Sequence, residues 1–202
     1  MSDAPKKQII LIRHGQTEWS KTGQHTGRSN IDLTERGRRE ARLVTPTLEG
    51  WEFAHVYSSP LSRALETANI AGLSDHIEID DNLMEWAYGV YEGRRQVDIQ
   101  VDEPGWSKWT AGVLEGGESA EQVGERADAA IENLLSAADD GPVAVFAHGH
   151  FLAILIARWL GMPAVQGKRF IIQTATVSQL GLKRGDHVLK SLNHRCGSAL
   201  AP

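Results

Sequence analysis

Two short runs of apolar residues, IILI at residues 9–12 after Gln8 and PVAVF at residues 142–146, give the clearest pattern in the chain. Apolar residues at successive positions lie on both faces of a strand, which is typical of central strands in a parallel sheet. Residues 55–58 and 77–80 have the length and composition of two further strands, and the second alternates between apolar and polar residues. We therefore predict a largely buried sheet.

Helices are predicted between and after these strands. Thr34 is a suitable N-cap for the first helix, and Ser119 with Gln122 three residues later forms the capping-box signature of another. The predicted helices cover residues 35–48, 62–71, 119–138 and 151–160. Strands that alternate with helices in this way indicate an α/β fold.

Two regions depart from this alternation. Residues 87–117 are rich in glycine and tryptophan, which predicts an irregular cap. Residues 174–178 and 187–190, on either side of an Arg-Gly-Asp turn, predict a terminal β-hairpin. A chain of 202 residues suits one sizeable core, so we expect a single domain over residues 1–202. The predicted architecture is a doubly wound, three-layer α/β/α sandwich with a mostly parallel central sheet.

Composition and charge narrow the classes of function. The formal net charge of -5 gives no basic field for nucleic acid or acidic lipid, so an anionic substrate needs a local basic pocket. The apolar runs are too short to span a bilayer and the N-terminus lacks a signal-peptide core, so we expect a cytoplasmic protein without a membrane partner. A single cysteine, Cys196, excludes an internal disulfide and a cysteine-built zinc site.

Both long apolar strands end in a histidine followed by glycine, at His14 and His148. In open α/β sheets, ligands bind in the crevice beyond the carboxyl ends of the strands. Arg63 and Glu85 also follow predicted strands. We therefore expect four polar side chains, from four places in the sequence, to converge on one crevice.

These residue types suit phosphoryl transfer. A neutral imidazole, held at its other nitrogen, can attack phosphorus, and His14 is the candidate nucleophile. The guanidinium groups of Arg13 and Arg63 match phosphate oxygens, and His148 supplies further charge stabilisation. A carboxyl group beside a phosphate dianion resists ionisation, so Glu85 suits the proton donor to the leaving group.

The same residues carry a family resemblance. The segment RHGQTEW at residues 13–19, with Thr26 and Gly27 after it, resembles the opening of the histidine phosphatase (phosphoglycerate mutase-like) superfamily. Arg63 in SPLSRA, Glu85 before Tyr-Gly and His148 before Gly149 follow in the family's order. The resemblance spans nearly the whole chain and implies a phosphohistidine intermediate on a small phosphorylated metabolite, with no metal and no cofactor. It also assigns phosphate or substrate binding to Arg13, Arg63, Thr26, Gly27, Ser20, Gln24 and Gly149.

Within the superfamily, residues 16–20, 23–24 and 85–93 resemble sedoheptulose-1,7-bisphosphatase-like and bacterial acid phosphatase members, which are hydrolases. Cofactor-dependent mutases typically carry Glu-Arg-His-Tyr-Gly at the acid, whereas this chain has Trp86 and Ala87 after Glu85. We therefore expect a phosphomonoesterase of sugar phosphates or bisphosphates, with broad acid-phosphatase-like activity. A 2,3-bisphosphoglycerate-dependent phosphoglycerate mutase is the alternative, and a non-catalytic binder of phosphorylated ligands ranks lower. The resemblance favours a homodimer.

Other residues have two interpretations. His148 and His150 form a His-x-His pair that could bind zinc or iron, but no second ligand cluster accompanies it. Three tryptophans lie in or next to the predicted cap, namely Trp86, Trp106 and Trp109. They either line a substrate pocket or pack the cap onto the domain. The cations of the predicted cap are Arg94, Arg95 and Lys108. They either bind a second phosphate of the substrate or are simply solvated, and the second interpretation is favoured. His25 has no motif around it and is interpreted as a surface or packing residue. Motifs of serine hydrolases, zincins and P-loop NTPases are absent from the sequence.

Overall fold

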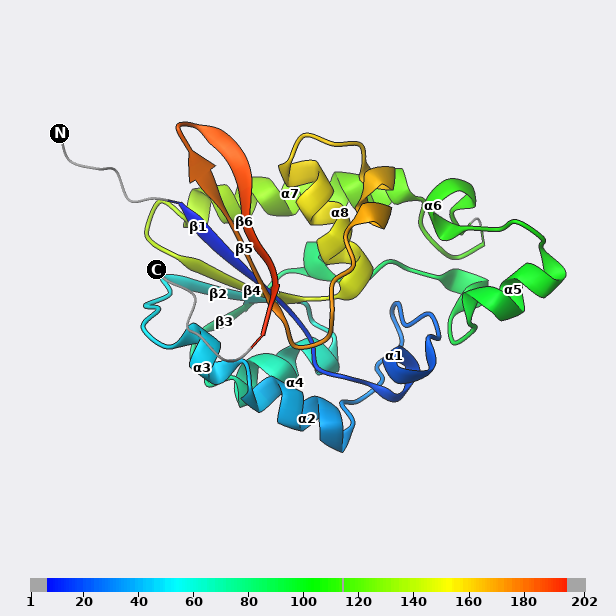
Figure 1. Cartoon of the computed structure of the whole chain (residues 1–202), viewed down its shortest axis with the longest axis horizontal. Coiled ribbons are helices and arrows are strands. Elements are labelled where there is room, and N and C mark those ends of the chain that lie inside the picture. Colours follow the sequence, from blue (N-terminus) through cyan, green and yellow to red (C-terminus); the bar gives the residue numbers. More distant parts are fainter. Residues whose placement is uncertain (1–6, 114, 196–202) are drawn as a thin grey trace.

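The computed structural model describes residues 7–113 and 115–195, and Cys196 therefore lies outside the described residues. Within that part of the chain, one six-stranded sheet has the order β3-β2-β4-β1-β5-β6 (Figure 1). The strands are β1 (Gln8–Arg13), β2 (His55–Ser58), β3 (Ile77–Ile79), β4 (Val143–Ala147), β5 (Val177–Lys183) and β6 (Asp186–His194). The pairs among β1 to β4 are parallel, and β5 and β6 extend the sheet in antiparallel pairing.

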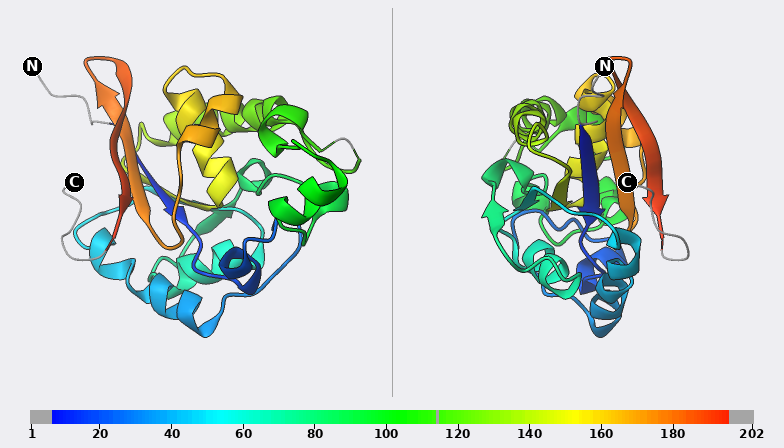
Figure 2. Two further views of the ribbon diagram at one scale, coloured as in Figure 1. Left: turned by 45° about the vertical axis from the view of Figure 1, so that its right-hand side comes forward. Right: turned by 90° about the vertical axis from the view of Figure 1, so that its left-hand side faces the viewer.

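Helices cover both faces of the sheet (Figures 1 and 2). The α-helices are α1 (Glu18–Thr22), α2 (Glu35–Arg42), α3 (Thr45–Leu48), α4 (Ser62–Ile70), α5 (Gln96–Asp102), α6 (Lys108–Ala111), α7 (Ala120–Ala137) and α8 (Gly149–Trp159). Short 3₁₀ turns are η1 (Asp81–Leu83), η2 (Gly89–Tyr91) and η3 (Ala164–Arg169). Helices α7 and α8 lie on one face, and α2, α3 and α4 lie on the other (Figure 2). The predicted three-layer α/β/α sandwich is confirmed.

The alternation of side chains along β1 divides the core into two clusters. Ile9 and Leu11 pack in the cluster that contains α7 and α8, whereas Ile10 and Ile12 pack with α4 on the opposite face. All four side chains are buried. A strand with apolar residues at every position is therefore stable only between two helical layers, as the sequence predicted.

Two predicted boundaries are wrong. The single helix predicted over 35–48 is two helices, because α2 ends at Arg42 and α3 begins at Thr45 with Pro46 in its first turn. Proline lacks an amide hydrogen and its ring clashes with the preceding turn, so a continuous helix cannot pass through it. The first strand of the terminal hairpin is Val177–Lys183 and leaves out residues 174–176. The predicted turn is present, since Arg184 and Gly185 both have positive φ.

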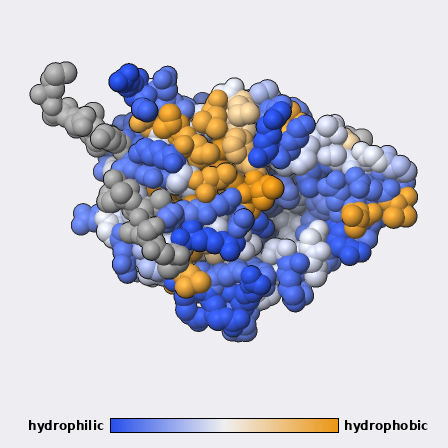
Figure 3. All heavy atoms as spheres, in the orientation of Figure 1, coloured by the Kyte–Doolittle hydropathy of each residue, from blue (hydrophilic) through white to orange (hydrophobic). Residues whose placement is uncertain are grey.

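The cap, residues 87–117, is more regular than predicted and contains α5 and α6. It lies beyond one end of the sheet (Figure 1). Its inner side contributes Ile99 and Trp106 to the main core cluster, whereas Val97 and Val101 of α5 are exposed at its outer tip (Figure 3). An antiparallel bridge between Gln24 and Arg95 ties the cap to the segment after α1. The inner face of the cap is thus fixed relative to the sheet.

Trp86, just before the cap, and the two cap tryptophans, Trp106 and Trp109, mostly serve packing. Trp86 and Trp106 are buried, and their indole N–H groups donate to the carbonyl oxygens of Glu118 (2.8 Å) and Gly112 (3.2 Å). Trp109 packs edge-on against Trp86 with ring centroids 5.3 Å apart. No helix among the described residues has the length and apolarity needed to cross a membrane.

Candidate active site

The carboxyl ends of β1 and β4 place two histidines side by side. Parallel pairing sets Arg13 opposite Ala147, and the amide of His14 donates to the carbonyl of Ala147 over 3.1 Å. The next residue after each strand is a histidine, and the rings of His14 and His148 lie with centroids 5.2 Å apart. The convergence expected from the two strand ends is therefore present in the structure.

His14 is held in one tautomer. Its side chain is buried, and Nδ1 lies 2.7 Å from the carbonyl oxygen of Gly15. A carbonyl oxygen only accepts hydrogen bonds, so Nδ1 carries the proton and Nε2 keeps its lone pair. Burial, together with the charges of Arg63 and Arg13, holds the pKa of His14 well below its ordinary value of 6.5. His14 is therefore neutral, with a free Nε2, at neutral pH.

Arg63 connects His148 to the loop after α1. Its fully buried guanidinium donates from Nη1 to the carbonyl of Ser29 (2.8 Å) and from Nη2 to those of Gly27 (2.8 Å) and Thr26 (3.3 Å). Its Nε donates to Nδ1 of His148 over 3.2 Å. Burial lowers the pKa of Arg63 to about 10, so the group stays charged at neutral pH.

His148 is likewise fixed at both nitrogens. Because Nδ1 accepts from Arg63, the proton is on Nε2, which lies 2.8 Å from Oγ of Ser59. Burial and the charge of Arg63 hold the pKa of His148 well below 6.5. His148 is thus a neutral, fully buried residue that orients Arg63.

Arg13 reaches the same place from β1. Its Nη1 donates to the carbonyl of Ile172, while its buried Nε has no hydrogen-bond partner among the described residues. A Cβ at Gly149 would lie 3.0 Å from Cζ of Arg13, so glycine is needed there for the guanidinium to approach α8. Arg13 therefore retains donors for a ligand.

Glu85 occupies the N-terminus of α8. Its Oε1 accepts from the amides of Trp86 (2.9 Å) and Phe151 (2.8 Å), and its Oε2 accepts from the amide of His150 (3.0 Å). The N-cap residue of α8 provides no side-chain hydrogen bond, so this carboxylate satisfies amides that the helix leaves unpaired. The side chain is 5% exposed, and that remaining surface faces the pocket.

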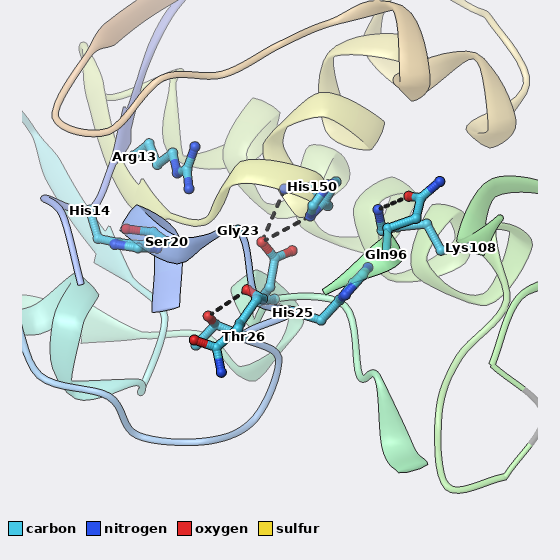
Figure 4. Close-up of a pocket in the computed structure, with 11 residues that line it drawn as sticks. Arg13, His14, Ser20, Gly23, His25, Thr26, Gln96, Lys108 and His150 are labelled. Carbon is cyan, nitrogen blue, oxygen red and sulfur yellow. Dashed lines mark hydrogen bonds and ion pairs between the residues drawn. The ribbon is translucent and has the colours of Figure 1, made fainter. Parts of the chain in front are cut away.

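A pocket of about 310 Å³ joins these groups (Figure 4). Of the residues predicted from sequence, it is lined by Arg13, His14, Glu85, Ser20, Gln24 and Thr26. The lining of this pocket does not include Arg63, His148, Gly27 or Gly149, and Gly149 lines a second pocket with Arg13 and His150. The predicted set is thus divided into a pocket surface and the groups that support it.

Several predicted binding groups are engaged in local structure. The amide of Gly27, predicted to contact phosphate, instead donates to Oε1 of Glu92 over 2.6 Å. Ser20 forms a capping box with Thr17 at the start of α1. Gln24 donates from Nε2 to the carbonyl of Gly93 over 2.7 Å, which attaches the pocket wall to the cap.

Comparison with known proteins agrees with this geometry. The model of the histidine phosphatase superfamily (branch 1) matches residues 9–195. The chain belongs to this superfamily. It is a phosphatase, and it is 39% identical over 180 residues to an acid phosphatase of Mycobacterium tuberculosis, with 88% of each chain covered. It is 34% identical over 190 residues to the sedoheptulose 1,7-bisphosphatase of Saccharomyces cerevisiae, covering 77% of this chain and 68% of the relative.

Solved histidine phosphatase structures share the fold. The alpha-ribazole phosphatase from Shigella flexneri superposes with a TM-score of 0.85 at 28% identity, covering 96% of this chain and 100% of the other. A mycobacterial glucosyl-3-phosphoglycerate phosphatase superposes with a TM-score of 0.82 at 27% identity, covering 93% and 98%. The resemblance inferred from the sequence motifs is confirmed.

Two pocket residues were not predicted as such from the sequence. His25, interpreted as a surface or packing residue, does pack edge-on against Tyr88, but it also lines the pocket. Lys108 of the cap was interpreted as solvated, yet it lines the pocket, and both side chains are at most 6% exposed. Arg94 and Arg95, in contrast, pair with Asp102 and Asp98 at the surface. The sequence did contain a signal for the burial of Lys108, because this lysine lies between Trp106 and Trp109. An interpretation based on charge alone does not use that signal.

His148 and His150 have different partners. His148 contacts Arg63 and Ser59, whereas Nδ1 of His150 lies 2.7 Å from the hydroxyl of Tyr88. Burial holds the pKa of His150 well below 6.5 and that of Tyr88 well above 10, so both groups are neutral. Over residues 7–113 and 115–195, no group of three His, Cys, Asp or Glu side chains is arranged to hold a metal ion.

Proposed function

We propose that the chain hydrolyses phosphomonoesters of small metabolites through a phosphohistidine formed at Nε2 of His14. The hydrogen bond from Nδ1 of His14 to the carbonyl of Gly15 carries this proposal, because it directs the unprotonated Nε2 away from the backbone. Arg13 lines the same pocket with donors to spare. The resulting arrangement is a nucleophile beside a cation that binds the phosphoryl oxygens.

In the first step, the lone pair of Nε2 attacks phosphorus and the bond from phosphorus to the leaving oxygen breaks. The carboxylate of Glu85 takes up a proton when the phosphate dianion binds beside it. Glu85 then donates this proton to the leaving oxygen, so the leaving group departs as a neutral alcohol. Arg13 binds equatorial oxygens directly. Four of the five N–H groups of Arg63 are used by His148 and three carbonyls of the described residues, so its main contribution is a fixed positive charge behind the phosphoryl group.

In the second step, water attacks the phosphohistidine. The carboxylate of Glu85 accepts a proton from this water while the bond between phosphorus and Nε2 breaks. Inorganic phosphate leaves, and His14 returns to its neutral form with Nε2 unprotonated. The imidazole and the arginines supply the nucleophile and the charge compensation, so we propose that the reaction requires neither a metal nor a cofactor.

The comparisons support a small phosphorylated metabolite as substrate. The relatives carry the names of an acid phosphatase and of phosphatases for a sugar bisphosphate and a glucosylated phosphoglycerate. The pocket of about 310 Å³ has the size of a small-molecule site. We propose sugar phosphates, sugar bisphosphates or phosphorylated hydroxy acids as substrates.

The test is to trap the phosphoenzyme. Enzyme mixed with an aryl phosphate and quenched rapidly should carry one acid-labile phosphoryl group on the peptide that contains His14. His14→Ala should lose both the labelling and the turnover, while His76→Asn, which changes an exposed histidine at positive φ, serves as the matched control. Labelling of His14→Ala, or loss of wild-type activity on chelation with EDTA, would contradict the mechanism.

A second experiment distinguishes hydrolysis from mutase activity. 3-Phosphoglycerate is incubated with the enzyme in the presence of 2,3-bisphosphoglycerate, and released phosphate and isomerised phosphoglycerate are measured in the same reaction. Faster release of phosphate indicates a hydrolase, and faster isomerisation indicates a mutase.

A further inference from the structure

The pocket continues beyond the reactive groups to a second set of polar side chains. In Figure 4, Arg13 and His14 lie at one side and Gln96 and Lys108 at the other, with His25 between them. Gln96 begins α5 and Lys108 begins α6, so both come from the cap. The described mechanism uses none of the three residues in this part of the pocket, namely Lys108, Gln96 and His25.

Lys108 is a buried cation without an anion. Its side chain is 6% exposed, and Nζ has one long contact, 3.5 Å, with Oε1 of Gln96. Among the described carboxylates, none forms a salt bridge with it, and the carboxylate that acts on it from a distance is Glu85, which three amides already hold. An ammonium group taken out of water without a counter-ion is costly, so its retention in a pocket indicates that a ligand supplies the negative charge.

The other two cations of the cap differ from Lys108. Arg95 forms two bonds of 2.7 Å with the carboxylate of Asp98, and Arg94 pairs with Asp102. Both pairs lie at the surface, with a third or more of each arginine side chain exposed. The cap therefore neutralises the cations that face solvent and leaves Lys108 unpaired inside the pocket.

His25 adds an acceptor beside this cation. Its Nδ1 lies 2.6 Å from the carbonyl of Arg94 and therefore carries the proton, which leaves Nε2 as an acceptor. Nε2 is buried and has no partner among the described residues, and the side chain is 5% exposed. Burial and the charge of Lys108 lower the pKa of His25 to about 4, so the ring is neutral. A buried acceptor without a donor in a ligand pocket suits a hydroxyl group of the ligand.

We propose that Lys108, Gln96 and His25 form a second subsite that binds an acidic group and a neighbouring hydroxyl of the substrate. The preferred substrates are then hydroxylated metabolites with two anionic groups, one phosphate at His14 and a second phosphate or a carboxylate at Lys108. This inference rests on the proposed function, because it places the reacting phosphate at His14. It assigns substrate selection to the cap together with His25, and chemistry to the ends of the strands.

The test compares substrates with one and with two anionic groups. For Lys108→Met, kcat/KM should fall roughly 10- to 100-fold for a sugar bisphosphate and for a phosphoglycerate, mainly through KM, because a charge-assisted contact is lost. p-Nitrophenyl phosphate has no second anionic group, so its kcat/KM should fall by about threefold or less in the same variant. Lys108→Arg should restore much of the preference. Arg95→Met, which removes a paired surface cation of the same cap, should leave it unchanged. The bisphosphate and the phosphoglycerate show which acidic group the subsite prefers.

Two kinetic outcomes would overturn this inference. Equal losses for all substrates in Lys108→Met would place the lysine at the reacting phosphate, and an unchanged kcat/KM for every substrate would give it no part in recognition. Calorimetric binding of the sugar bisphosphate to His14→Ala, with and without Lys108→Met, separates the subsite from the catalytic proposal. Weaker binding in the double variant supports the subsite even if no phosphohistidine is found, and equal binding rejects it.

Discussion

Nε of Arg63 donates a hydrogen bond to Nδ1 of His148 over 3.2 Å, although the two residues are 85 positions apart in the sequence. Neither side chain is exposed to solvent. The bond fixes the tautomer of His148 and the plane of the guanidinium at once. Since the same guanidinium binds three carbonyls of residues 26–29, one side chain connects α4, the end of β4 and the loop after α1.

Arg63→Lys should therefore lower activity while preserving the charge. A lysine presents one ammonium group in place of a planar fork, so it cannot replace the bonds to His148 and to the carbonyls together. We expect kcat/KM for an aryl phosphate to fall by about 100-fold, the size of an effect from a misplaced stabilising group. Arg36→Lys, at an exposed position on α2, is the control. Wild-type kinetics in Arg63→Lys would show that the fork is unnecessary.

Glu85→Gln should show a dependence on the leaving group. A nitrophenolate leaves without a proton, whereas the alkoxide of an alkyl phosphate needs one from the acid. We expect kcat to fall by about 100-fold or more for the alkyl phosphate and by much less for p-nitrophenyl phosphate. The exposed Glu121→Gln, in the first turn of α7, controls for the change of charge. Equal losses for both substrates would assign Glu85 to capping α8 alone.

The buried neutral histidines should make the fold sensitive to mild acid. Four histidines have folded pKa values below the ordinary 6.5, so below pH 6.5 the unfolded chain binds protons that the native state does not. They are His14, His25, His148 and His150. The free energy of unfolding should therefore decrease as pH falls from 6.5 to 5, by about 1 kcal/mol per unit for each histidine.

Urea unfolding at a series of pH values measures this slope. The carboxyl group of Glu118, whose pKa is lowered from 4.5, contributes mainly at lower pH and so leaves the window to the histidines. His25→Phe should reduce the slope by about a quarter, since it removes one of four groups. A free energy of unfolding that stays level or rises between pH 6.5 and 5 would contradict the neutral burial of these rings.

The preference for a second anion should depend on pH in the alkaline range. Burial lowers the pKa of Lys108 to about 8, against the opposing charge of Glu85, so the ammonium of the free enzyme loses its proton above that pH. The ratio of kcat/KM for a sugar bisphosphate to that for p-nitrophenyl phosphate should fall as pH rises from 7 to 9. Both substrates are already fully ionised there, because the second pKa of a phosphate ester is about 6.

Lys108→Arg is the matched variant for this profile, because a guanidinium keeps its charge throughout the range. His25 and His150, which also face the pocket, stay neutral over the same interval. The ratio should therefore remain level in Lys108→Arg. A fall of equal size in both proteins would place the titrating group elsewhere.

The strand ends were predictable from sequence because their signal is local. An apolar run followed by His-Gly indicates both the strand and the first polar residue beyond its carboxyl end, as at His14 and His148. The break after α2 had a local signal in Pro46, which the apolar spacing obscured. The family resemblance then supplied the register for Glu85 and Arg63.

The interior of the pocket was not predictable in the same way. The bonds of Arg63 to residues 26–29 join segments more than 30 positions apart, and nothing in either segment identifies the other. The burial of Lys108 depends on how the cap packs through Ile99 and Trp106. Such contacts are determined by tertiary packing. From the pattern of charges in the sequence, the buried Lys108 cannot be distinguished from Arg95, which is paired at the surface.

The bridge between Gln24 and Arg95 attaches the cap to a wall of the pocket at one point of backbone pairing. The strand ends that hold His14 and His148 belong to a rigid sheet, whereas Gln96 and Lys108 stand on two short helices. Changes at Gln96 and Lys108 can therefore alter which substrates are selected while the strand ends that carry the chemistry keep their places. Ile99 and Trp106, which anchor the same segment in the core, have to be retained in any such change.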